Sequence, residues 1–260
     1  MLKNILKLII SELIVKLHFP FIPSNDKEVI SAIRKNGFFV INNFISAEYC
    51  SQLVKMAHKE MDNYPQYLSI ESMGSDYRIY GVDVLNRKFR IESVEKINKS
   101  FFNYFHTFPK RKSFILLGKI LYSASGKGSG TGWHRDSPFS HQFKTILYIS
   151  DVNESNGPFQ YVKSSGNFKS IRQVSKFLKK GINEDRFTNE DIDTLIENRV
   201  IDEPQTFCGK AGTLILVDTR GLHRGKPLEE GVRYALTCYN YNRKLPKSIQ
   251  KLPLFRIEKK

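Results

Sequence analysis

The sequence predicts a mainly β protein, either a sandwich or a jelly roll, with flanking helices. From about residue 113, short runs rich in β-branched and aromatic residues alternate with Gly, Asn and Pro, as in all-β domains. Hydrophobic residues make up 40% of the chain, with 19 phenylalanines and 12 tyrosines, which is enough for a substantial core. The length of 260 residues fits one large domain, or a domain with extensions.

The N-terminal stretch "MLKNILKLIISELIVKL" predicts an amphipathic helix over residues 1–18. Its apolar face carries Leu2, Leu6, Ile9, Ile10, Leu13 and Leu17. Ser11 and Glu12 interrupt the run, which lacks a cleavage site and is too short and too charged to span a bilayer. Such a helix packs on its own domain or on a second subunit. Alternatively it lies on a membrane, with Lys3, Lys7 and Lys16 near anionic lipid.

Two further helices and one strand are expected before residue 63. "FPFIPS" (19–24) ends the first helix, because proline cannot continue it. A second helix runs from about Asp26 to Asn36 and stops at Gly37. "FFVINNF" (38–44) predicts a strand, and Ser46 caps a helix through about Asp62.

The β region consists of five apolar runs interrupted by one helical insertion. The expected strands are "SFILLGKILYSA", "FKTILYISDV", "PFQYVK", "GTLILVD" and "VRYALTCYNY". Residues from about 168 to 200 have helical patterning, first basic and then acidic. We expect this insertion to be either a lid or substrate-binding element over a site, or a structural cover on one sheet.

The formal net charge of +15 points to an anionic partner. Part of it lies in the basic C-terminal tail, residues 243–260, which we expect to be solvated. Cys50, Cys208 and Cys238 are odd in number and far apart, which fits buried thiols in a reducing compartment rather than disulfides. No nucleic-acid-binding pattern is present, so nucleic acid is not an expected partner.

"TGWHRDSPF" (131–139) contains the only His-x-Asp in the chain. On a strand, His134 and Asp136 point to one face and can bind one ion, although a salt-bridged loop explains the pair equally well. His223, in "TRGLHRG", follows the strand "GTLILVD" and can complete a 2-His-1-carboxylate site, as in non-haem Fe(II) oxygenases. Three open positions suit 2-oxoglutarate and dioxygen, and Arg233 on the next strand can bind the distal carboxylate.

These residues, in order, resemble the phytanoyl-CoA dioxygenase-like family of Fe(II)/2-oxoglutarate-dependent oxygenases. "NGFFVINNFISAEYCSQL" is similar to the family's opening helix-strand-helix, "GWHRDS" to its His-x-Asp motif, and "DVNESNGPFQYVKSSG" to its Asn-Gly turn and following strand. "AGTLILVDTRGLHRG" is similar to the strand with the distal histidine, and Arg233 has the expected offset. The resemblance covers about residues 28–242.

The resemblance implies a double-stranded β-helix, a jelly roll, as a single oxygenase domain over residues 19–242. It implies Fe(II) bound by His134, Asp136 and His223, with 2-oxoglutarate paired to Arg233, O2 as cosubstrate and ascorbate as a candidate reductant. Related halogenases replace the acid of the motif with a small residue. The presence of Asp136 therefore favours hydroxylation over halogenation.

Several positions depart from the family pattern or stay open. "SSGNF" lacks the usual histidine after the Asn-Gly turn. Tyr122 or Ser123 could bond to 2-oxoglutarate, and Tyr122 is preferred. Arg135 either holds an acid group of the cosubstrate or substrate, or neutralises a surface carboxylate. His141 is a rival ligand in a predicted loop, and Trp133 is expected to pack beside the site.

We therefore expect a dioxygenase that hydroxylates an unactivated C–H bond of an anionic small-molecule, sugar-linked or lipid-linked substrate. The basic half of the insertion favours such an anion: Lys169, Arg172, Lys176, Lys179 and Lys180. Alternatives are desaturation, cyclisation or epimerisation at the same iron site, or a non-catalytic basic binding module on a jelly roll. The expected location is the cytoplasm, with membrane association through residues 1–18 as a further hypothesis. The sequence specifies neither the substrate nor the oligomeric state.

Overall fold

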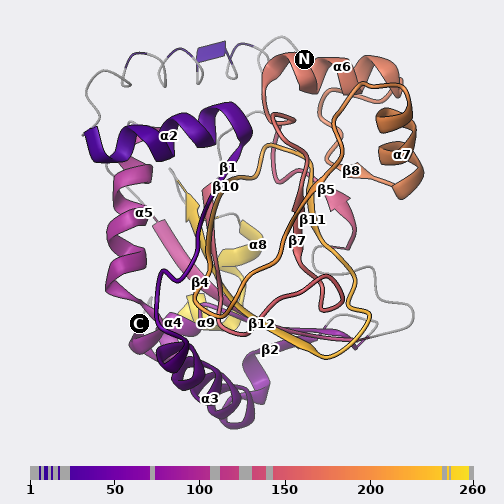
Figure 1. The fold of residues 1–260 in the computed structure, drawn as a ribbon. Coiled ribbons are helices and arrows are strands. Elements are labelled where there is room, and N and C mark those ends of the chain that lie inside the picture. The colour runs from indigo at the N-terminus through magenta and orange to yellow at the C-terminus, as the bar shows by residue number, and fades with distance from the viewer. Residues whose placement is uncertain are drawn as a thin grey trace.

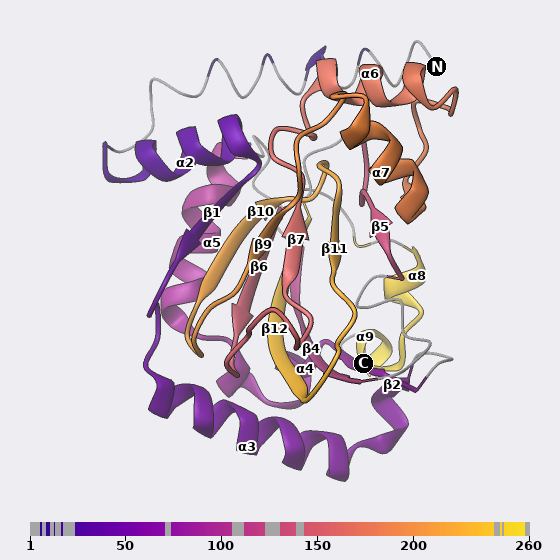
Figure 2. The ribbon, with the colours of Figure 1, turned by 45° about the vertical axis from the view of Figure 1, so that its right-hand side comes forward.

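Two antiparallel sheets facing each other form the centre of the protein (Figures 1 and 2). The computed structural model describes residues 24–70, 74–105, 112–122, 131–138, 143–241, 245 and 247–257, together with Leu6, Ile9, Ile10, Leu13 and Leu17. The larger sheet has the order β1 (Phe38–Ile41), β10 (Leu214–Asp218), β6 (Phe143–Tyr148), β12 (Val232–Tyr241), β4 (Lys112–Leu121), β3 (Asp76–Tyr80) and β2 (Leu68–Ile70). The smaller sheet has the order β8 (Arg186–Phe187), β5 (Trp133–His134), β11 (His223–Gly225), β7 (Phe159–Tyr161) and β9 (Gln205–Phe207). The predicted jelly-roll core with flanking helices is confirmed.

The outer face of the larger sheet is covered by α2 (Ser24–Asn36), α3 (Ala47–Asn63) and α5 (Glu92–Phe105) (Figure 2). Strand β10 shows that both faces of this sheet are covered, because all five of its residues are buried. Leu214 and Leu216 pack in the cluster under the helices, whereas Ile215 and Val217 pack between the sheets. Alternation along the strand thus fills both layers, and each fully buried aliphatic side chain contributes about 1.5–3 kcal/mol.

The early helices agree with their sequence signals. Ser46 accepts a hydrogen bond from the backbone N–H of Tyr49 and caps α3, as predicted. Gly37 ends α2 with φ of +96° and donates its N–H to the carbonyl of Ile33 at 2.8 Å. The strand predicted over residues 38–44 is shorter in the structure, where β1 ends at Ile41. The sequence reading did not anticipate β2, β3, the short helix α4 (Val82–Leu85) or α5.

The insertion contains α6 (Phe168–Phe177), β8 and α7 (Asn189–Glu197). Its apolar residues form a separate cluster with Trp133, Val162 and Leu222 of the smaller sheet and its loops. The helices therefore cover that sheet from outside rather than closing over the space between the sheets. Only β8 joins the sheet, as an edge strand beside β5.

Expectations for the two chain ends need revision or lie outside the described part. The solvated-tail prediction fails for Leu254 and Phe255, which are 2% and 7% exposed. They belong to the segment of α8 (Lys247–Gln250) and α9 (Pro253–Ile257), where the Phe255 ring meets Phe114 edge-on at 5.3 Å. Most of the predicted helix 1–18 lies outside the described residues. The described residues of that stretch, Leu6, Ile9, Ile10, Leu13 and Leu17, are helical and 45–63% exposed.

Two smaller points concern membranes and thiols. Within the described part of the chain, no helix combines the length and apolarity required to cross a bilayer. Cys50 and Cys238 are buried as expected, but Cys208 is exposed. The prediction of a core thiol at Cys208 is wrong, because the residue follows the end of β9 instead of pointing into a sheet interface.

Candidate active site

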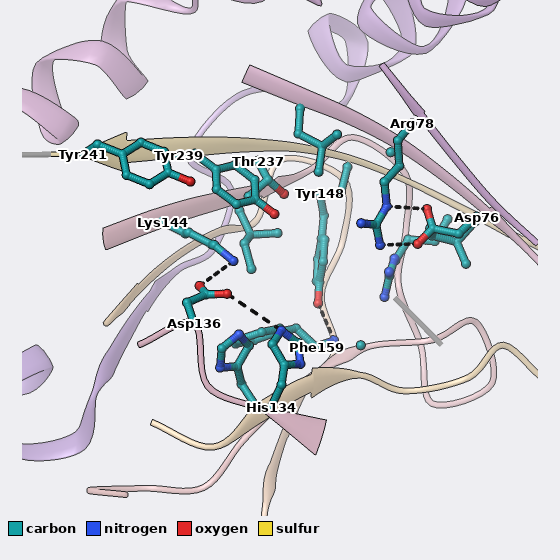
Figure 3. A pocket seen from close by; sticks show the side chains of 18 of the residues that line it. Asp76, Arg78, His134, Asp136, Lys144, Tyr148, Phe159, Thr237, Tyr239 and Tyr241 are labelled. Atoms are coloured by element: carbon teal, nitrogen blue, oxygen red, sulfur yellow. Dashed lines mark hydrogen bonds and ion pairs between the residues drawn. The ribbon is translucent and has the colours of Figure 1, made fainter. Parts of the chain in front are cut away.

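A cavity of about 390 Å³ lies between the two sheets. One wall is the inner face of β12, where alternate residues point inward: Arg233, Ala235, Thr237, Tyr239 and Tyr241. The opposite wall comes from the smaller sheet, whose strands β5 and β11 carry His134 and His223. Figure 3 shows the side chains of this cavity. Residues from eight strands and one loop thus line a single cavity.

His134 and His223 are direct cross-strand neighbours, paired in register between β5 and β11. Their ring centroids are 4.2 Å apart. Asp136 follows β5, and its Oδ1 lies 3.9 Å from the Nε2 of His134. One ligand atom from each of the three residues lies within 4.8 Å of the others. The structure therefore brings together the three predicted metal ligands, although His134 and His223 are 89 positions apart in the sequence.

The two imidazoles present the same nitrogen to the cavity. The Nδ1 of His134 lies 2.9 Å from the carbonyl of Gly132, and the Nδ1 of His223 lies 2.9 Å from the carbonyl of Gly221. A carbonyl only accepts, so each Nδ1 must carry the proton, and each Nε2 is left with its lone pair. The buried Nε2 of His223 has no hydrogen-bond partner among the described residues. This donor set fits a transition metal such as Fe(II).

The electrostatics keep these three side chains in the protonation states that binding a metal ion requires. Burial lowers the pKa of His134 to about 4, although Asp136 opposes the shift, and burial also lowers the pKa of His223. Burial alone would raise the pKa of Asp136, but Lys144 and the two histidines outweigh it and hold the pKa well below its usual value. At neutral pH the group is two neutral imidazoles and one carboxylate.

Lys144, on β6, is a site residue that the sequence reading missed. Its Nζ lies 2.6 Å from the Oδ2 of Asp136 and 4.4 Å from the centroid of the Tyr239 ring (Figure 3). Its side chain is 8% exposed, and burial would lower its pKa, but Asp136 outweighs this and raises it. A lysine inside the apolar run "FKTILY" was the available signal, since lysine is rarely buried without a partner.

Arg233 lies at the other end of the cavity, buried with 6% exposure. Register places Asp76, Ile120 and Arg233 in one row across β3, β4 and β12. Burial lowers the pKa of Arg233, opposed by Tyr148 and Asp76, and its Nε has no hydrogen-bond partner within the described part of the chain. A buried guanidinium with an unsatisfied donor is suited to bind a carboxylate of a ligand.

Asp76 and Tyr148, whose side chains are held by their own partners, lie near Arg233 at this end of the cavity. Asp76 receives a two-point ion pair from Arg78, with the Nε–Oδ1 distance at 2.9 Å. The hydroxyl of Tyr148 accepts from the N–H of Phe159 at 2.9 Å and donates to the carbonyl of Phe207 at 3.1 Å. Tyr148 therefore acts as a rigid partition between the Asp76–Arg78 pair and the Lys144–Asp136 pair (Figure 3).

Other predicted residues lie away from the cavity. Tyr122 is 57% exposed and does not line it, so the structure gives no support for a contact with 2-oxoglutarate. Ser123 and His141 lie outside the described residues. Trp133 packs beside the site, as expected, in the cluster behind β5.

Both expectations for Arg135 are wrong. Its side chain is buried on the far side of β5, and Nη1 donates to the carbonyls of Ser165 at 2.6 Å and Arg220 at 3.1 Å. It thus braces the loops behind the site. The basic half of the insertion also lies elsewhere, because Lys169, Arg172, Lys176, Lys179 and Lys180 do not line the cavity. The insertion contributes Arg186 instead.

Comparisons with known proteins agree with this geometry. The family model described as Phytanoyl-CoA dioxygenase (PhyH) matches residues 33–229. The structure of the epimerase SnoN in complex with Fe3+, alpha ketoglutarate and nogalamycin RO is similar, with a TM-score of 0.63 at 11% identity over 89% of this chain and 91% of that one. EctD from S. alaskensis with bound Fe has a TM-score of 0.57 at 14% identity, over 81% and 74% of the two chains.

A third similar structure is HygX from Streptomyces hygroscopicus with nickel and 2-oxoglutarate, with a TM-score of 0.54 at 14% identity over 82% of this chain and 85% of that one. No curated protein matches the sequence. At these identities the structural matches establish a shared fold, and the family model covers most of the chain.

Proposed function

This chain belongs to the phytanoyl-CoA dioxygenase family and is a 2-oxoglutarate-dependent dioxygenase that uses Fe(II) and O2; we propose that His134, Asp136 and His223 bind the iron and that Arg233 binds the distal carboxylate of 2-oxoglutarate. The observation that carries the assignment is the convergence of three ligand atoms between the two sheets, where the Nε2 of His223 has no hydrogen-bond partner among the residues that the structure describes. The resemblance read from the ordered motifs is confirmed by the family match.

Two neutral imidazoles and one carboxylate would hold Fe(II) and would leave it able to bind the cosubstrate and oxygen as well. When bound, iron and 2-oxoglutarate supply the oxidising power, with 2-oxoglutarate losing carbon dioxide to become succinate. The side chains and carbonyls of the protein position the metal ligands and the cosubstrate. The carbonyls of Gly132 and Gly221 orient the rings, Lys144 holds one oxygen of Asp136, and Arg233 draws the cosubstrate toward Tyr148.

We propose hydroxylation of an unactivated C–H bond as the reaction, on an anionic small-molecule, sugar-linked or lipid-linked substrate. The presence of Asp136 supports oxygen transfer, because related halogenases carry a small residue in place of this acid. Desaturation, cyclisation and epimerisation remain alternatives, and similar structures include an epimerase and a carbocyclase, SnoN and SnoK. The non-catalytic binding module loses its basis, because the family is enzymatic.

The test of the site is an anaerobic titration of the purified protein with Fe(II) and then 2-oxoglutarate, following the visible charge-transfer band of the chelate. We expect the band in the wild type and its loss in His134→Ala and Asp136→Ala. His58→Ala is the matched control, because His58 contacts the hydroxyl of Tyr234 at 3.0 Å and does not line the cavity. A folded wild type without the band, or a band that survives both ligand substitutions, would refute the assignment.

The reaction type is tested by the mass of the product once succinate release has identified a substrate. Hydroxylation adds one oxygen atom, and desaturation or oxidative ring closure removes two hydrogens. Epimerisation leaves the mass unchanged. A product that gains no oxygen would contradict hydroxylation without affecting the assignment of the iron site.

Membrane contact through residues 1–18 stays a proposal, supported by the exposed apolar side chains of Leu6, Ile9, Ile10, Leu13 and Leu17. Lysines at positions 3, 7 and 16 favour an anionic bilayer. Flotation with phosphatidylserine vesicles is expected to recover the full chain but not a chain lacking residues 1–18. If both chains stay with the protein fraction, the membrane proposal is wrong.

A further inference from the structure

The insertion delivers one charged side chain to the active-site cavity. Within β8, Phe187 pairs with Trp133 and joins the apolar cluster behind the sheet. Arg186 pairs in register with His134, and opposite residues of antiparallel strands place their side chains on the same face. Arg186 therefore points toward the face that carries the proposed iron ligands and lines the cavity beside His134.

The surroundings of Arg186 hold its backbone and its guanidinium. Its backbone N–H donates to the Oε1 of Glu184 at 3.1 Å, and its Nη1 donates to the Oγ1 of Thr131 at 3.0 Å. Thr131 lies in the turn that leads into β5 and has φ of +60°. Arg186 is exposed, whereas Lys144 and Arg233 are buried. It is thus a cation of the cavity wall that an incoming molecule can reach from solvent.

The formal charges of the cavity favour a further anion. The described lining includes two acids, Asp76 and Asp136, and four cations, Arg78, Lys144, Arg186 and Arg233. The dianion 2-oxoglutarate balances the charge of Fe(II), so the loaded cavity keeps an excess of two positive charges. Lys144 and Arg78 already contact Asp136 and Asp76, and Arg233 lies at the buried end that we assign to the cosubstrate.

We propose that Arg186 is a specificity-determining residue that binds an oxyanion, a carboxylate or a phosphate, of the organic substrate. The inference rests on the proposed function, because it presumes iron and 2-oxoglutarate in the adjacent site. A substrate held at Arg186 would have its neighbouring carbon atoms beside His134, one of the proposed iron ligands. The anionic preference expected from the insertion's charge then comes from Arg186 on β8, and not from the lysines of its helices.

The experiment uses the full chain loaded with Mn(II) in place of Fe(II) and saturated with 2-oxoglutarate. The probes are inorganic phosphate and acetate, observed through the paramagnetic relaxation of their 31P and 13C signals. Relaxation falls steeply with distance from Mn(II), so it reports binding beside the metal. Comparing the two probes distinguishes a phosphate-selective from a carboxylate-selective subsite.

We expect enhanced relaxation of at least one probe in the wild type and a loss of at least tenfold in affinity in Arg186→Gln. Arg186→Lys keeps the charge and retains part of the binding. Arg172→Gln is the matched control, because Arg172 belongs to α6 of the same insertion and does not line the cavity. The affinity for 2-oxoglutarate is expected to be unchanged in Arg186→Gln.

Two results would overturn the inference: no enhancement with either probe in the wild type, or equal enhancement in Arg186→Gln. A failure of the proposed function is seen separately, because the wild type would then bind neither Mn(II) nor 2-oxoglutarate before any probe is added. Thermal unfolding of each variant establishes that it is folded, and Arg186→Lys carries the test if Arg186→Gln is not.

Discussion

The Nζ of Lys144 lies 2.6 Å from the Oδ2 of Asp136, while the Oδ1 of the same carboxylate lies 3.9 Å from the Nε2 of His134. The two oxygens therefore differ in their surroundings. Oδ2 contacts the ammonium group of Lys144, whereas Oδ1 lies on the side of the histidines. Carboxylates bind metals through one oxygen or through two. Because Lys144 holds the second oxygen, Asp136 would bind a metal ion through one oxygen only and would leave room for the cosubstrate.

Lys144→Met tests this consequence. We expect the variant to bind Mn(II), because all three ligands remain, but to bind 2-oxoglutarate about tenfold more weakly, about 1.4 kcal/mol. Without the lysine, the second oxygen of Asp136 is free to compete for the metal. Calorimetric titration of the Mn(II)-loaded protein measures the affinity. Lys144→Arg, which keeps a cation, is the control, and equal 2-oxoglutarate affinity in Lys144→Met and the wild type would exclude this role.

Arg233→Gln is expected to weaken 2-oxoglutarate binding about 100-fold, about 2.7 kcal/mol, because a charge-assisted pair with the distal carboxylate is lost. Arg233→Lys should be intermediate, since it keeps the charge but loses the planar fork. Mn(II) affinity should not change. The same titration provides both numbers, with Arg224→Gln as a control arginine that does not line the cavity. If 2-oxoglutarate binds Arg233→Gln as it binds the wild type, the cosubstrate is anchored elsewhere.

The metal-free protein should lose stability as the pH falls from about 6.5 toward 4. Burial lowers the pKa of His134 from its usual 6.5 to about 4 and also lowers the pKa of His223, so in this window the unfolded chain binds more protons than the folded one. Each histidine contributes a slope of about 1.4 kcal/mol per pH unit. The pKa of Asp136 is lowered, so its stabilising charge is lost only at pH values below the usual 3.8. Asp136 therefore does not contribute to the loss of stability between pH 6.5 and 4.

Urea unfolding in EDTA at several pH values measures this slope. His134→Gln should reduce it by one histidine's share, whatever its effect on the absolute stability. A slope that is the same in His134→Gln and the wild type would show that His134 is not held neutral in the folded protein.

Gly221 and Gly118 form a matched pair for packing beside the site. A Cβ at Gly221 would lie 1.9 Å from the hydroxyl of Tyr161, whereas the nearest atom to a Cβ at Gly118 is the carbonyl of Ala235 at 3.9 Å. Gly221→Ala should therefore destabilise the protein by about 1–3 kcal/mol and weaken metal binding, since the carbonyl of Gly221 orients His223. Gly118→Ala should be neutral or stabilising by up to about 1 kcal/mol. Similar unfolding free energies for the two variants would contradict this packing.

Much of the fold was accessible from the sequence because local chemistry specified it. Ser46, Gly37 and the helical patterning of the insertion define their elements through interactions within a few residues. The candidate metal ligands could be proposed from the sequence because His-x-Asp, the distal histidine and Arg233 stand at recognisable offsets on predicted strands. Lys144, Arg186 and the Asp76–Arg78 pair were missed, because their signals are single charges in strands or in segments with no strong periodicity.

By itself, the sequence determined the alternation that makes the strands, the caps that end the helices, and the ordered residues that reveal the family. Those features depend on neighbours along the chain or on spacing within one strand. The tertiary structure decided what meets what: that Lys144 of β6 holds Asp136, that Arg135 points away from the site, and that the insertion offers Arg186 rather than its lysines. Register between strands distant in sequence sets these contacts, and shifting a strand by one residue would exchange its inward and outward faces.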